Sequence, residues 1–344
     1  MFKYIYIIGL VLFISCNKQN TSVKPNPVIP PVVTTTFFAK GADISWVTQM
    51  EAAGKKFYDS TGTQLDCFQL MKNLGFNSIR LRAWVNPSDG WCNTGDMVAK
   101  AMRAKALGLK IMVDFHYSDI WADPGHQTIP AAWTGMSISS LDSAVFSYTQ
   151  TVLKTLKQNS VTPTWVQVGN ETDDGMLWET GRASTNMANF ASLVASGYNA
   201  VKSVDSTIQV IVHISNGSEN THFRWIFDGL KANNAKWDII GMSLYPPTNS
   251  WATYDAQCLA NINDMISRYG RPVMICEVGM DVNSPSICYS FLTDILSKVK
   301  SVSNNNGLGV FYWEPECNSN WNSYSLGAFD NTGKPTIALN AFAN

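Results

Sequence analysis

Beyond residue 36, the chain alternates short apolar runs with longer segments of helical spacing. The short runs lie at residues 39–44, 78–83, 110–115, 164–169, 209–214, 239–244, 273–277 and 309–313. Their nearly continuous apolar character is typical of buried parallel strands. Helical spacing occurs at residues 65–74, 96–107, 144–158, 184–204, 223–232, 255–269 and 290–302. A final helix is expected to begin near Pro335.

This regular alternation predicts the fold. A chain of 344 residues can form one large barrel or two ordinary domains. Eight strand and helix units with no compositional break favour the α/β class and a single closed (β/α)8 barrel, the TIM-barrel architecture. An open doubly wound sheet is the alternative, but no glycine-rich phosphate loop follows the first run.

The N-terminus predicts export. Residues 4–14 are apolar but too few to span a bilayer, and Cys16 follows a small residue. Residues 1–15 resemble a bacterial lipoprotein signal, in which Cys16 becomes lipidated; a cleaved secretory signal is the alternative, because Phe13 departs from the usual aliphatic residue. Residues 16–36 are rich in proline and threonine and predict a tether. Residues 37–344 are expected to form the folded (β/α)8 domain. We expect an exported protein anchored at the outer membrane or cell surface.

Composition restricts the partners. Charged residues make up 15% of the chain and the net charge is -1, which argues against nucleic acid or a polyanionic substrate. The chain contains 12 Trp, 12 Tyr and 16 Phe, and several tryptophans fall in predicted loops. Exposed aromatic faces can stack on the apolar faces of sugars. We expect a neutral substrate and a monomeric protein.

Two glutamates are the candidate catalytic pair. Glu171 follows the fourth apolar run and Glu277 ends the seventh. Barrel enzymes keep their chemistry at the C-terminal ends of the strands, and these two strands are far enough apart for their ends to face each other. Glycoside cleavage needs two such carboxyls, one to protonate the leaving oxygen and one to attack or to activate water.

The six cysteines after Cys16 fit no metal-ligand spacing. Cys276 falls inside a predicted buried strand, where a free thiol is expected. Cys92 and Cys317 follow the second and eighth strands, and we hypothesise a disulfide between them because export permits one.

Five motifs resemble glycoside hydrolase family 53, the endo-β-1,4-galactanases. They are KGADIS at 40–45, IRLRAWVNP at 79–87, DFHYSDIWADP at 114–124, QVGNE at 167–171 and FYWEP at 311–315. The motif at 114–124 is the most specific of them. The resemblance implies a retaining (β/α)8 enzyme that cleaves β-1,4-galactosidic bonds in galactan and arabinogalactan, with Glu171 as acid/base and Glu277 as nucleophile.

The resemblance also implies the groups around the two glutamates. Asn170 would bind the sugar 2-hydroxyl, Arg80 would keep the nucleophile ionised and Tyr245 would hydrogen-bond it. His116 would orient groups or bind sugar, and Trp313 would form the floor for the sugar at the cleavage point. Further candidates for binding neighbouring galactose units are Trp84, Asp119, Trp121 and Trp321, although the loop tryptophans can instead pin loops to the barrel.

We expect structural roles for other charged residues near the strand ends. Asp114 is expected to be an internal ion-pair partner, and Arg82 to pair with Asp43 or Asp114. Glu314 can cap a helix or bind sugar. The short segment 280–285 offers few oxygen ligands for calcium, so no metal and no cofactor are expected.

Two other functions remain open from the residues alone. A noncatalytic glycan-binding lipoprotein would share the tether and the aromatics, but it would not need the two glutamates. Another barrel β-glycanase, a mannanase or cellulase, would keep the glutamates and differ in its loops.

Overall fold

The computed structural model describes residues 1–2, 37–318 and 320–343. The chain divides into two units, Met1–Thr36 and Phe37–Asn344. Cys16, the predicted tether and residues 3–15 of the predicted signal lie outside the described residues. Among the residues that are described, no helix is both long and apolar enough to cross a bilayer.

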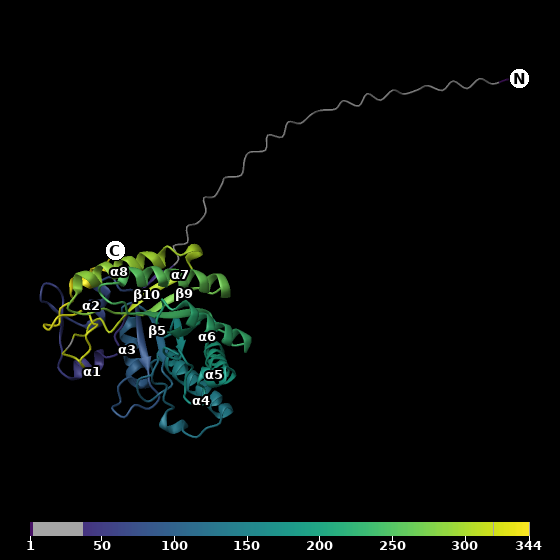
Figure 1. Cartoon of the computed structure of the whole chain (residues 1–344), viewed down its shortest axis with the longest axis horizontal. Helices are drawn as coiled ribbons and strands as arrows, with labels where there is room; N and C mark the ends of the chain where they lie inside the picture. Colours follow the sequence, from purple (N-terminus) through teal and green to yellow (C-terminus); the bar gives the residue numbers. More distant parts are fainter. Residues whose placement is uncertain (3–36, 319, 344) are drawn as a thin grey trace. The chain divides into compact units, whose positions relative to one another are not determined.

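Eight parallel strands form a closed barrel in the unit Phe37–Asn344, which confirms the predicted (β/α)8 architecture (Figure 1). Each barrel strand pairs with the preceding barrel strand, and β10 pairs with β1 to close the ring. The closed ring excludes the open doubly wound sheet. The strands are β1 (Ala39–Asp43), β4 (Ser78–Ala83), β5 (Lys110–Phe115), β6 (Trp165–Val168), β7 (Gln209–Ile214), β8 (Ile239–Leu244), β9 (Val273–Val278) and β10 (Gly307–Trp313).

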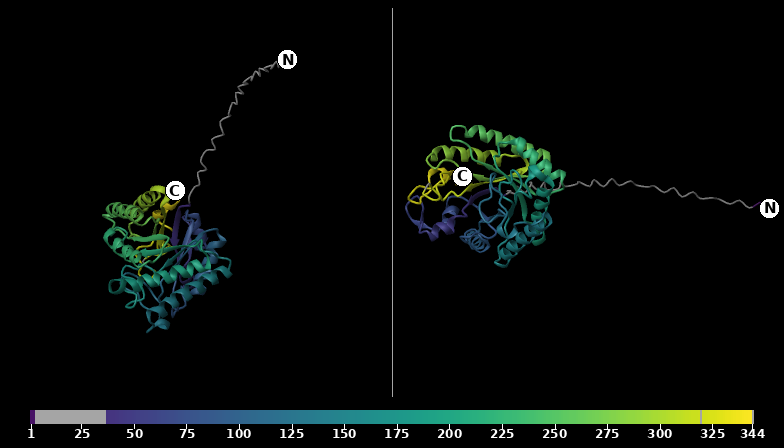
Figure 2. Two further views of the ribbon diagram at one scale, coloured as in Figure 1. Left: turned by 90° about the vertical axis from the view of Figure 1, so that its right-hand side faces the viewer. Right: turned by 60° about the horizontal axis from the view of Figure 1, so that its bottom comes forward.

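Helices surround the outside of the strands (Figure 2). They are α1 (Val47–Ala52), α2 (Cys67–Asn73), α3 (Thr94–Ala106), α4 (Ile138–Gln158), α5 (Ala183–Val204), α6 (Asn220–Ala232), α7 (Trp251–Tyr269) and α8 (Pro285–Lys300). The predicted start of α4 at residue 144 is six residues late, because the Ser137 hydroxyl accepts the backbone N–H of Ser140 and caps the helix there. Asp66 and Asn93 cap α2 and α3 in the same way.

Several short elements were not predicted, or differ from prediction. The helix α1 and the hairpin β2 (Phe57–Tyr58) and β3 (Gln64–Leu65) lie between β1 and α2. Short 3-10 helices occur at η1 (Ala131–Trp133) and η2 (Ser303–Asn305). The helix expected near Pro335 is the 3-10 helix η3 (Ile337–Phe342). Its six residues are too few for a stable α-helix without strong tertiary support.

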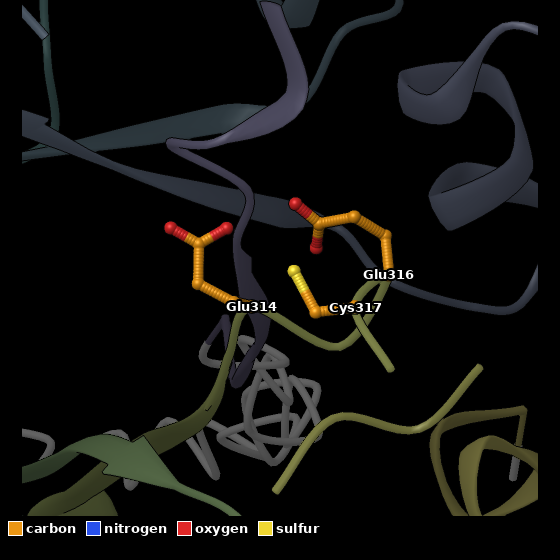
Figure 3. Close-up of side chains that lie close together, drawn as sticks. All are labelled: Glu314, Glu316 and Cys317. Carbon is orange, nitrogen blue, oxygen red and sulfur yellow. The ribbon is translucent and has the colours of Figure 1, made fainter. Parts of the chain in front are cut away.

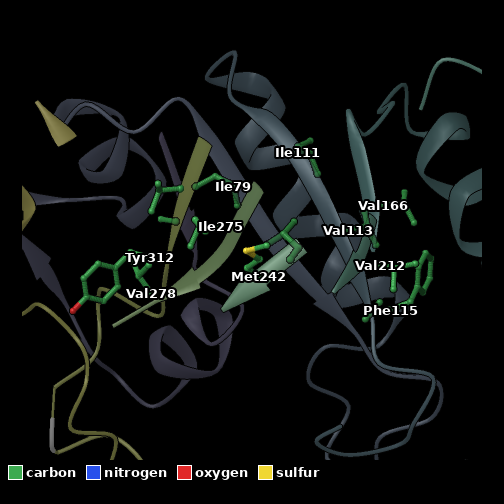
Figure 4. Packing of buried hydrophobic residues seen from close by; sticks show 14 of the residues in the cluster. Ile79, Ile111, Val113, Phe115, Val166, Val212, Met242, Ile275, Val278 and Tyr312 are labelled. Atoms are coloured by element: carbon green, nitrogen blue, oxygen red, sulfur yellow. The ribbon is translucent and has the colours of Figure 1, made fainter. Parts of the chain in front are cut away.

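The main core lies between the strands and the helices. Strand residues that face outward, such as Ile79, Val113 and Ile275, are fully buried or nearly so and pack in one apolar cluster (Figure 4). Each such side chain contributes roughly 1.5–3 kcal/mol by leaving water. This packing fixes the strands as a rigid ring, and the side chains at their C-terminal ends are therefore held in place.

The barrel interior has two halves, which we name by their chemistry. The apolar half consists of Ala39, Met112, Trp165, Ile211, Ile239, Met274, Cys276 and Phe311. Gly41 belongs to this layer because a Cβ there would lie 2.0 Å from the Phe311 ring. The polar half follows toward the C-terminal ends of the strands and consists of Asp43, Arg80, Arg82, Asp114, Gln167, His213, Ser243 and Glu277.

All six described cysteines are free and buried. The free thiol expected at Cys276 is confirmed, and the hypothesised bridge between Cys92 and Cys317 is wrong. The Cys92 sulfur lies 3.8 Å from the Ser45 carbonyl oxygen, whereas the Cys317 sulfur lies 3.7 Å from the Met50 sulfur. The two thiols pack into different neighbours although both loops lie at the same end of the barrel.

Candidate active site

A cleft of about 940 Å³ opens at the C-terminal end of the barrel. Glu171 and Glu277 both line it, although more than a hundred positions separate them in the sequence. Six of the predicted substrate-binding side chains line the same cleft: Trp84, His116, Trp121, Asn170, Tyr245 and Trp313. Arg80 is fully buried and lies beneath this surface, in contact with residues that line it.

Glu171 reaches the cleft through a sharp turn after β6. Gly169 adopts a φ of 86°, and a Cβ there would lie 2.5 Å from Thr172 Cγ2, so the turn requires glycine. Glu171 itself has a φ of 42°. Its Oε1 accepts a hydrogen bond of 2.6 Å from the Ser243 hydroxyl. Burial first, and then the charge on Glu277, raise the pKa of Glu171 well above its ordinary value.

Glu277 enters the cleft because β9 contains a bulge. Met242 on β8 pairs with Ile275, but the next residue, Ser243, pairs with Glu277, so Cys276 is an extra residue on β9. Strict alternation would turn Glu277 outward with Ile275. The bulge instead lets two consecutive residues face inward, and Cys276 packs in the apolar half while Glu277 joins the polar half.

The Glu277 carboxylate is held by two donors. Arg80 Nη2 lies 2.9 Å from its Oε1, and the Tyr245 hydroxyl donates to its Oε2 at 2.8 Å. Burial raises the pKa of Glu277 to about 7, and both donors act against that rise. Glu277 therefore ionises before Glu171, because Arg80 forms an ion pair with Glu277 and not with Glu171.

Arg80 connects the groups beneath the cleft. Its guanidinium forms ion pairs with Asp43 at 2.7 Å, Asp114 at 2.9 Å and Glu277 at 2.9 Å. It also donates to Gln167 Oε1 at 2.7 Å and to Asn170 Oδ1 at 2.8 Å. The predicted internal ion pair of Asp114 is confirmed. A buried guanidinium with this many partners fixes their positions, since any displacement would leave a charge unpaired.

Arg82 pairs with Glu314 at 3.1 Å, so the predicted pairing with Asp43 or Asp114 is wrong. Asp43 and Asp114 instead form ion pairs with Arg80, which lies two residues before Arg82 on β4 and deeper in the barrel. The Arg82 guanidinium lies 4.2 Å from the Trp121 ring centroid and 5.3 Å from that of Trp84. Its Nε and Nη2 lack hydrogen-bond acceptors among the described residues, and the aromatic faces supply the compensating interaction.

His116 is neutral and fixed by neighbours on both sides of its ring. Its Nε2 lies 3.0 Å from Asp114 Oδ2, and its Nδ1 accepts the indole N–H of Trp84 at 3.2 Å and the Ala122 N–H at 3.0 Å. Burial lowers the pKa of His116, although Asp114 opposes that effect. The ring therefore orients Trp84 and the loop that begins at Tyr117.

A sequence model described as glycosyl hydrolase family 53 matches residues 39–342, nearly all of the barrel unit. The chain belongs to glycosyl hydrolase family 53. The Thermothelomyces thermophilus arabinogalactan endo-β-1,4-galactanase is 33% identical over 330 residues, which cover 88% of this chain and 98% of that protein. A probable arabinogalactan endo-β-1,4-galactanase A of Neosartorya fischeri is 35% identical over 300 residues, covering 80% and 83%.

A solved structure of fungal β-1,4-galactanases superimposes on this family 53 chain with a TM-score of 0.82. The two chains share 31% identity, and the match covers 88% of this chain and 98% of the other. The predicted family and fold are confirmed.

The aromatic walls of the family 53 cleft include groups that the sequence pattern did not single out. Trp46 contacts Trp121 and Trp313 with ring centroids 5.5 and 5.2 Å apart. Tyr324 lies 4.7 Å from Trp313 in an edge-to-face arrangement. Trp46 follows the KGADIS motif directly. Its place just after the end of a barrel strand was the signal that could have predicted its position in the cleft.

Three polar groups were also missed: Gln167, His213 and Ser243. His213 and Ser243 lie on β7 and β8 and share the inward face with Ile211 and Ile239. A polar residue at an inward position near a strand end was the signal that could have found them.

Two predicted sugar-binding residues lie outside the cleft lining. The Asp119 carboxylate accepts the backbone N–H groups of Asn86 and Ala131, both at 2.8 Å, and so joins three segments of loop. Trp321 is half-buried, and its indole nitrogen has no acceptor among the described residues. Their sugar-binding roles stay predictions.

A cluster of Glu314, Glu316 and Cys317 lies beside the cleft floor, with the three side chains turned toward one another (Figure 3). One ligand atom from each lies within 4.8 Å of the others, a grouping that can hold a metal ion. The surroundings do not favour one, because the Arg82 guanidinium already pairs with Glu314. Burial also raises the pKa of the Cys317 thiol well above its ordinary value. Burial, and then the nearby charge of Glu314, raise the pKa of the Glu316 carboxyl well above its ordinary value.

Proposed function

We propose that the protein is a retaining endo-β-1,4-galactanase that cleaves the main chain of galactan and arabinogalactan. Glu277 attacks the anomeric carbon while Glu171 protonates the departing glycosidic oxygen, and the sugar is then bound covalently to Glu277. Glu171, now ionised, takes a proton from water, and the hydroxide oxygen displaces Glu277. The names of the relatives support the substrate, and the pair of carboxyls in one cleft supports the chemistry.

The observation that carries the proposal is the unequal environment of the two glutamates. Glu277 faces the Arg80 cation and a Tyr245 hydroxyl, whereas the carboxyl of Glu171 has one side-chain donor among the described residues, the neutral Ser243 hydroxyl. The charge on Glu277 raises the pKa of Glu171, so the two carboxyls are close enough to interact. One carboxylate and one carboxylic acid can therefore coexist, which double displacement needs.

The proposed substrate-binding groups suit a neutral polysaccharide. Asn170 Oδ1 accepts from Arg80 and its amide donates to the Ala122 carbonyl, so the side chain is fixed beside Glu171 for contact with a sugar hydroxyl. Trp84, Trp121 and Trp313 supply apolar faces. A volume of about 940 Å³ is at the upper end of the range for small-molecule pockets, which leaves room for more than one sugar ring.

The test is hydrolysis of unbranched β-1,4-galactan, followed by new reducing ends and by product size over time. We expect oligosaccharides first, as an endo-acting enzyme gives, and β as the first anomer seen by NMR. Hydrolysis of mannan or cellulose with galactan left intact would move the substrate to another β-glycan. Binding without any new reducing ends would make the protein a glycan-binding module.

We also propose that residues 1–36 export the protein and anchor it to a membrane through lipidated Cys16. The apolar run followed by a small residue and Cys16 supports this. Metabolic labelling with a fatty acid should mark the wild-type protein but not Cys16→Ser. Release of unlabelled wild-type protein into the medium would favour a cleaved secretory signal.

A further inference from the structure

A chain of hydrogen bonds reaches Glu171 from the barrel interior. The Ser243 hydroxyl lies 2.6 Å from Glu171 Oε1 and 2.8 Å from His213 Nε2. Ser243 and His213 are both almost completely buried. Among the described residues, these two groups are the only side-chain partners of the Ser243 hydroxyl. Its proton must therefore go to one of them.

The surroundings of His213 decide which of its nitrogens carries a proton. Gln167 Oε1 accepts from Arg80 Nε at 2.7 Å, so the amide nitrogen of Gln167 faces away from Arg80. That nitrogen donates to Asp114 Oδ1 at 3.0 Å and to His213 Nδ1 at 2.9 Å. His213 Nδ1 therefore accepts a hydrogen bond. Asn170 Oδ1, 3.1 Å from the same nitrogen, already accepts from Arg80.

His213 is neutral and carries its single proton on Nε2. Burial, reinforced by the nearby charge of Arg80, lowers its pKa well below the ordinary value. With Nδ1 accepting, Nε2 must donate to the Ser243 oxygen. The Ser243 hydroxyl then has one remaining role, which is to donate to Glu171 Oε1. The direction of every bond from Arg80 through Gln167, His213 and Ser243 is thereby fixed.

We propose that His213 and Ser243 are positioning residues that keep the acid proton of Glu171 on Oε2, the oxygen that Ser243 does not contact. This inference rests on the proposed function of Glu171. In the first step Oε2 gives its proton to the glycosidic oxygen, and in the second step the same oxygen takes a proton from water. Ser243 donates to Oε1 throughout. With the reverse tautomer of His213, the Ser243 hydroxyl would donate to His213 and accept a hydrogen bond from a proton on Oε1, on the side away from the substrate.

Several other charged or titratable groups act on Glu171, and they set the pH dependence. Those from the surrounding strands and loops are Glu277, Asp173, Arg80, His213 and Tyr245. The charges of Glu277 and Asp173 raise the pKa of Glu171, whereas Arg80 and the Ser243 hydrogen bond lower it. Loss of the Ser243 hydroxyl should therefore raise the pKa of Glu171 further.

Two matched pairs of variants test the proposal. Ser243→Ala removes the donor, and Ser243→Thr keeps a hydroxyl. His213→Gln places an amide near the Nε2 position and can still donate to Ser243, whereas His213→Asn keeps only a group near the Nδ1 position. For each protein, kcat and kcat/KM are measured against pH on galactan and on an aryl β-galactobioside with a good leaving group. Thermal melting reports whether each variant is folded.

We expect Ser243→Ala and His213→Asn to lose about ten- to hundredfold in kcat on galactan, a part of the effect of general acid catalysis. The loss on the aryl substrate should be much smaller, since that leaving group needs little protonation. For Ser243→Ala the alkaline limb should move up by about one pH unit. Ser243→Thr and His213→Gln should stay within about threefold of the wild type.

The proposal would be overturned if both variants of a pair lost kcat equally, or if a variant lost kcat equally on galactan and on the aryl substrate. Either result would mean that Ser243 and His213 act only through packing. If neither His213 variant folds, the Ser243 pair alone decides. The wild type separates this question from the proposed function. Wild-type cleavage of a different β-glycan would refute only the substrate, and the variants would then be compared on that glycan. A wild type without glycanase activity would refute the proposed function itself.

Discussion

The apolar half and the polar half of the barrel interior share six of the eight barrel strands, yet they are held by different forces. Met112, Trp165 and Ile211 meet in the apolar half, and two residues further along the same strands come Asp114, Gln167 and His213. Packing in the first half is non-directional and depends on volume. In the second half each hydrogen bond and ion pair has a direction, and Arg80 alone contacts five polar side chains.

The difference shows how the fold separates stability from chemistry. The apolar half closes the ring at one end without polar groups that need partners. The polar half is expensive to bury, because each charge must find a counter-charge. Its value is preorganisation, since donors and charges already in place need not rearrange as the reaction proceeds. Variants in the two halves should therefore affect different measurements.

The largest effect on turnover is expected from a substitution in the polar half. Glu277→Ala removes the proposed nucleophile and should lower kcat on the order of 10⁴-fold. Folding should survive, because Arg80 keeps Asp43 and Asp114 as partners. Steady-state kinetics and thermal melting check both statements. Asp281→Ala is the control, since the hydrogen bonds of this loop carboxylate within the described part of the chain go to Asn283 in its own turn. Near-normal turnover by Glu277→Ala would remove this glutamate from the mechanism.

The matching variant in the apolar half is Met112→Ala. Met112 is completely buried, and its truncation should lower the free energy of unfolding by about 2–5 kcal/mol. At temperatures where the variant is folded, kcat should stay within about twofold of the wild type. Chemical denaturation and kinetics provide the measurements. Met102→Ala on α3 is the control because Met102 is 46% exposed. A large loss of kcat in folded Met112→Ala would mean that the two halves are not independent.

The pH dependence separates the two glutamates. The proposed mechanism requires ionised Glu277, whose pKa burial raises to about 7, and protonated Glu171, whose pKa burial and the charge of Glu277 raise well above its ordinary value. The profile of kcat/KM should be bell-shaped, rising with ionisation of Glu277 and falling as Glu171 loses its proton. Tyr245→Phe removes a hydrogen bond that lowers the pKa of Glu277, so the acidic limb should move up by about one pH unit. A shift of the alkaline limb alone would contradict this assignment.

The smallest effect is expected on stability, from the buried carboxyl pair Glu314 and Glu316. Burial raises the pKa of Glu316 well above 4.5, so above that pH the folded state binds a proton that the unfolded state has lost. Wild-type stability should then fall as pH rises, by at most about 1.4 kcal/mol per pH unit from this group. Glu316→Gln should remove this slope and be the more stable protein at pH 8, by thermal melting. Glu219→Gln, at an exposed site, controls for net charge. An unchanged slope in Glu316→Gln would show that Glu316 is not its source.

Much of the fold was predictable because its signals are local. Strands buried on both faces have a continuous apolar run, and all eight barrel strands were placed within three residues of their ends. Helix starts were less well predicted, as at α4, because a cap depends on one hydroxyl such as Ser137 rather than on periodicity. The hairpin of β2 and β3 was missed because two-residue strands carry no periodic pattern.

The sequence could place Glu171 and Glu277 at the ends of the fourth and seventh barrel strands, and its motifs indicated family 53. It could not show that Glu277 faces inward, because that orientation comes from a bulge whose register is set by pairing with β8. Nor could it show that Arg82 pairs with Glu314, or that His213 supports Ser243. Periodicity acts between neighbours in the chain, whereas partners in a closed ring come from strands that meet only after folding.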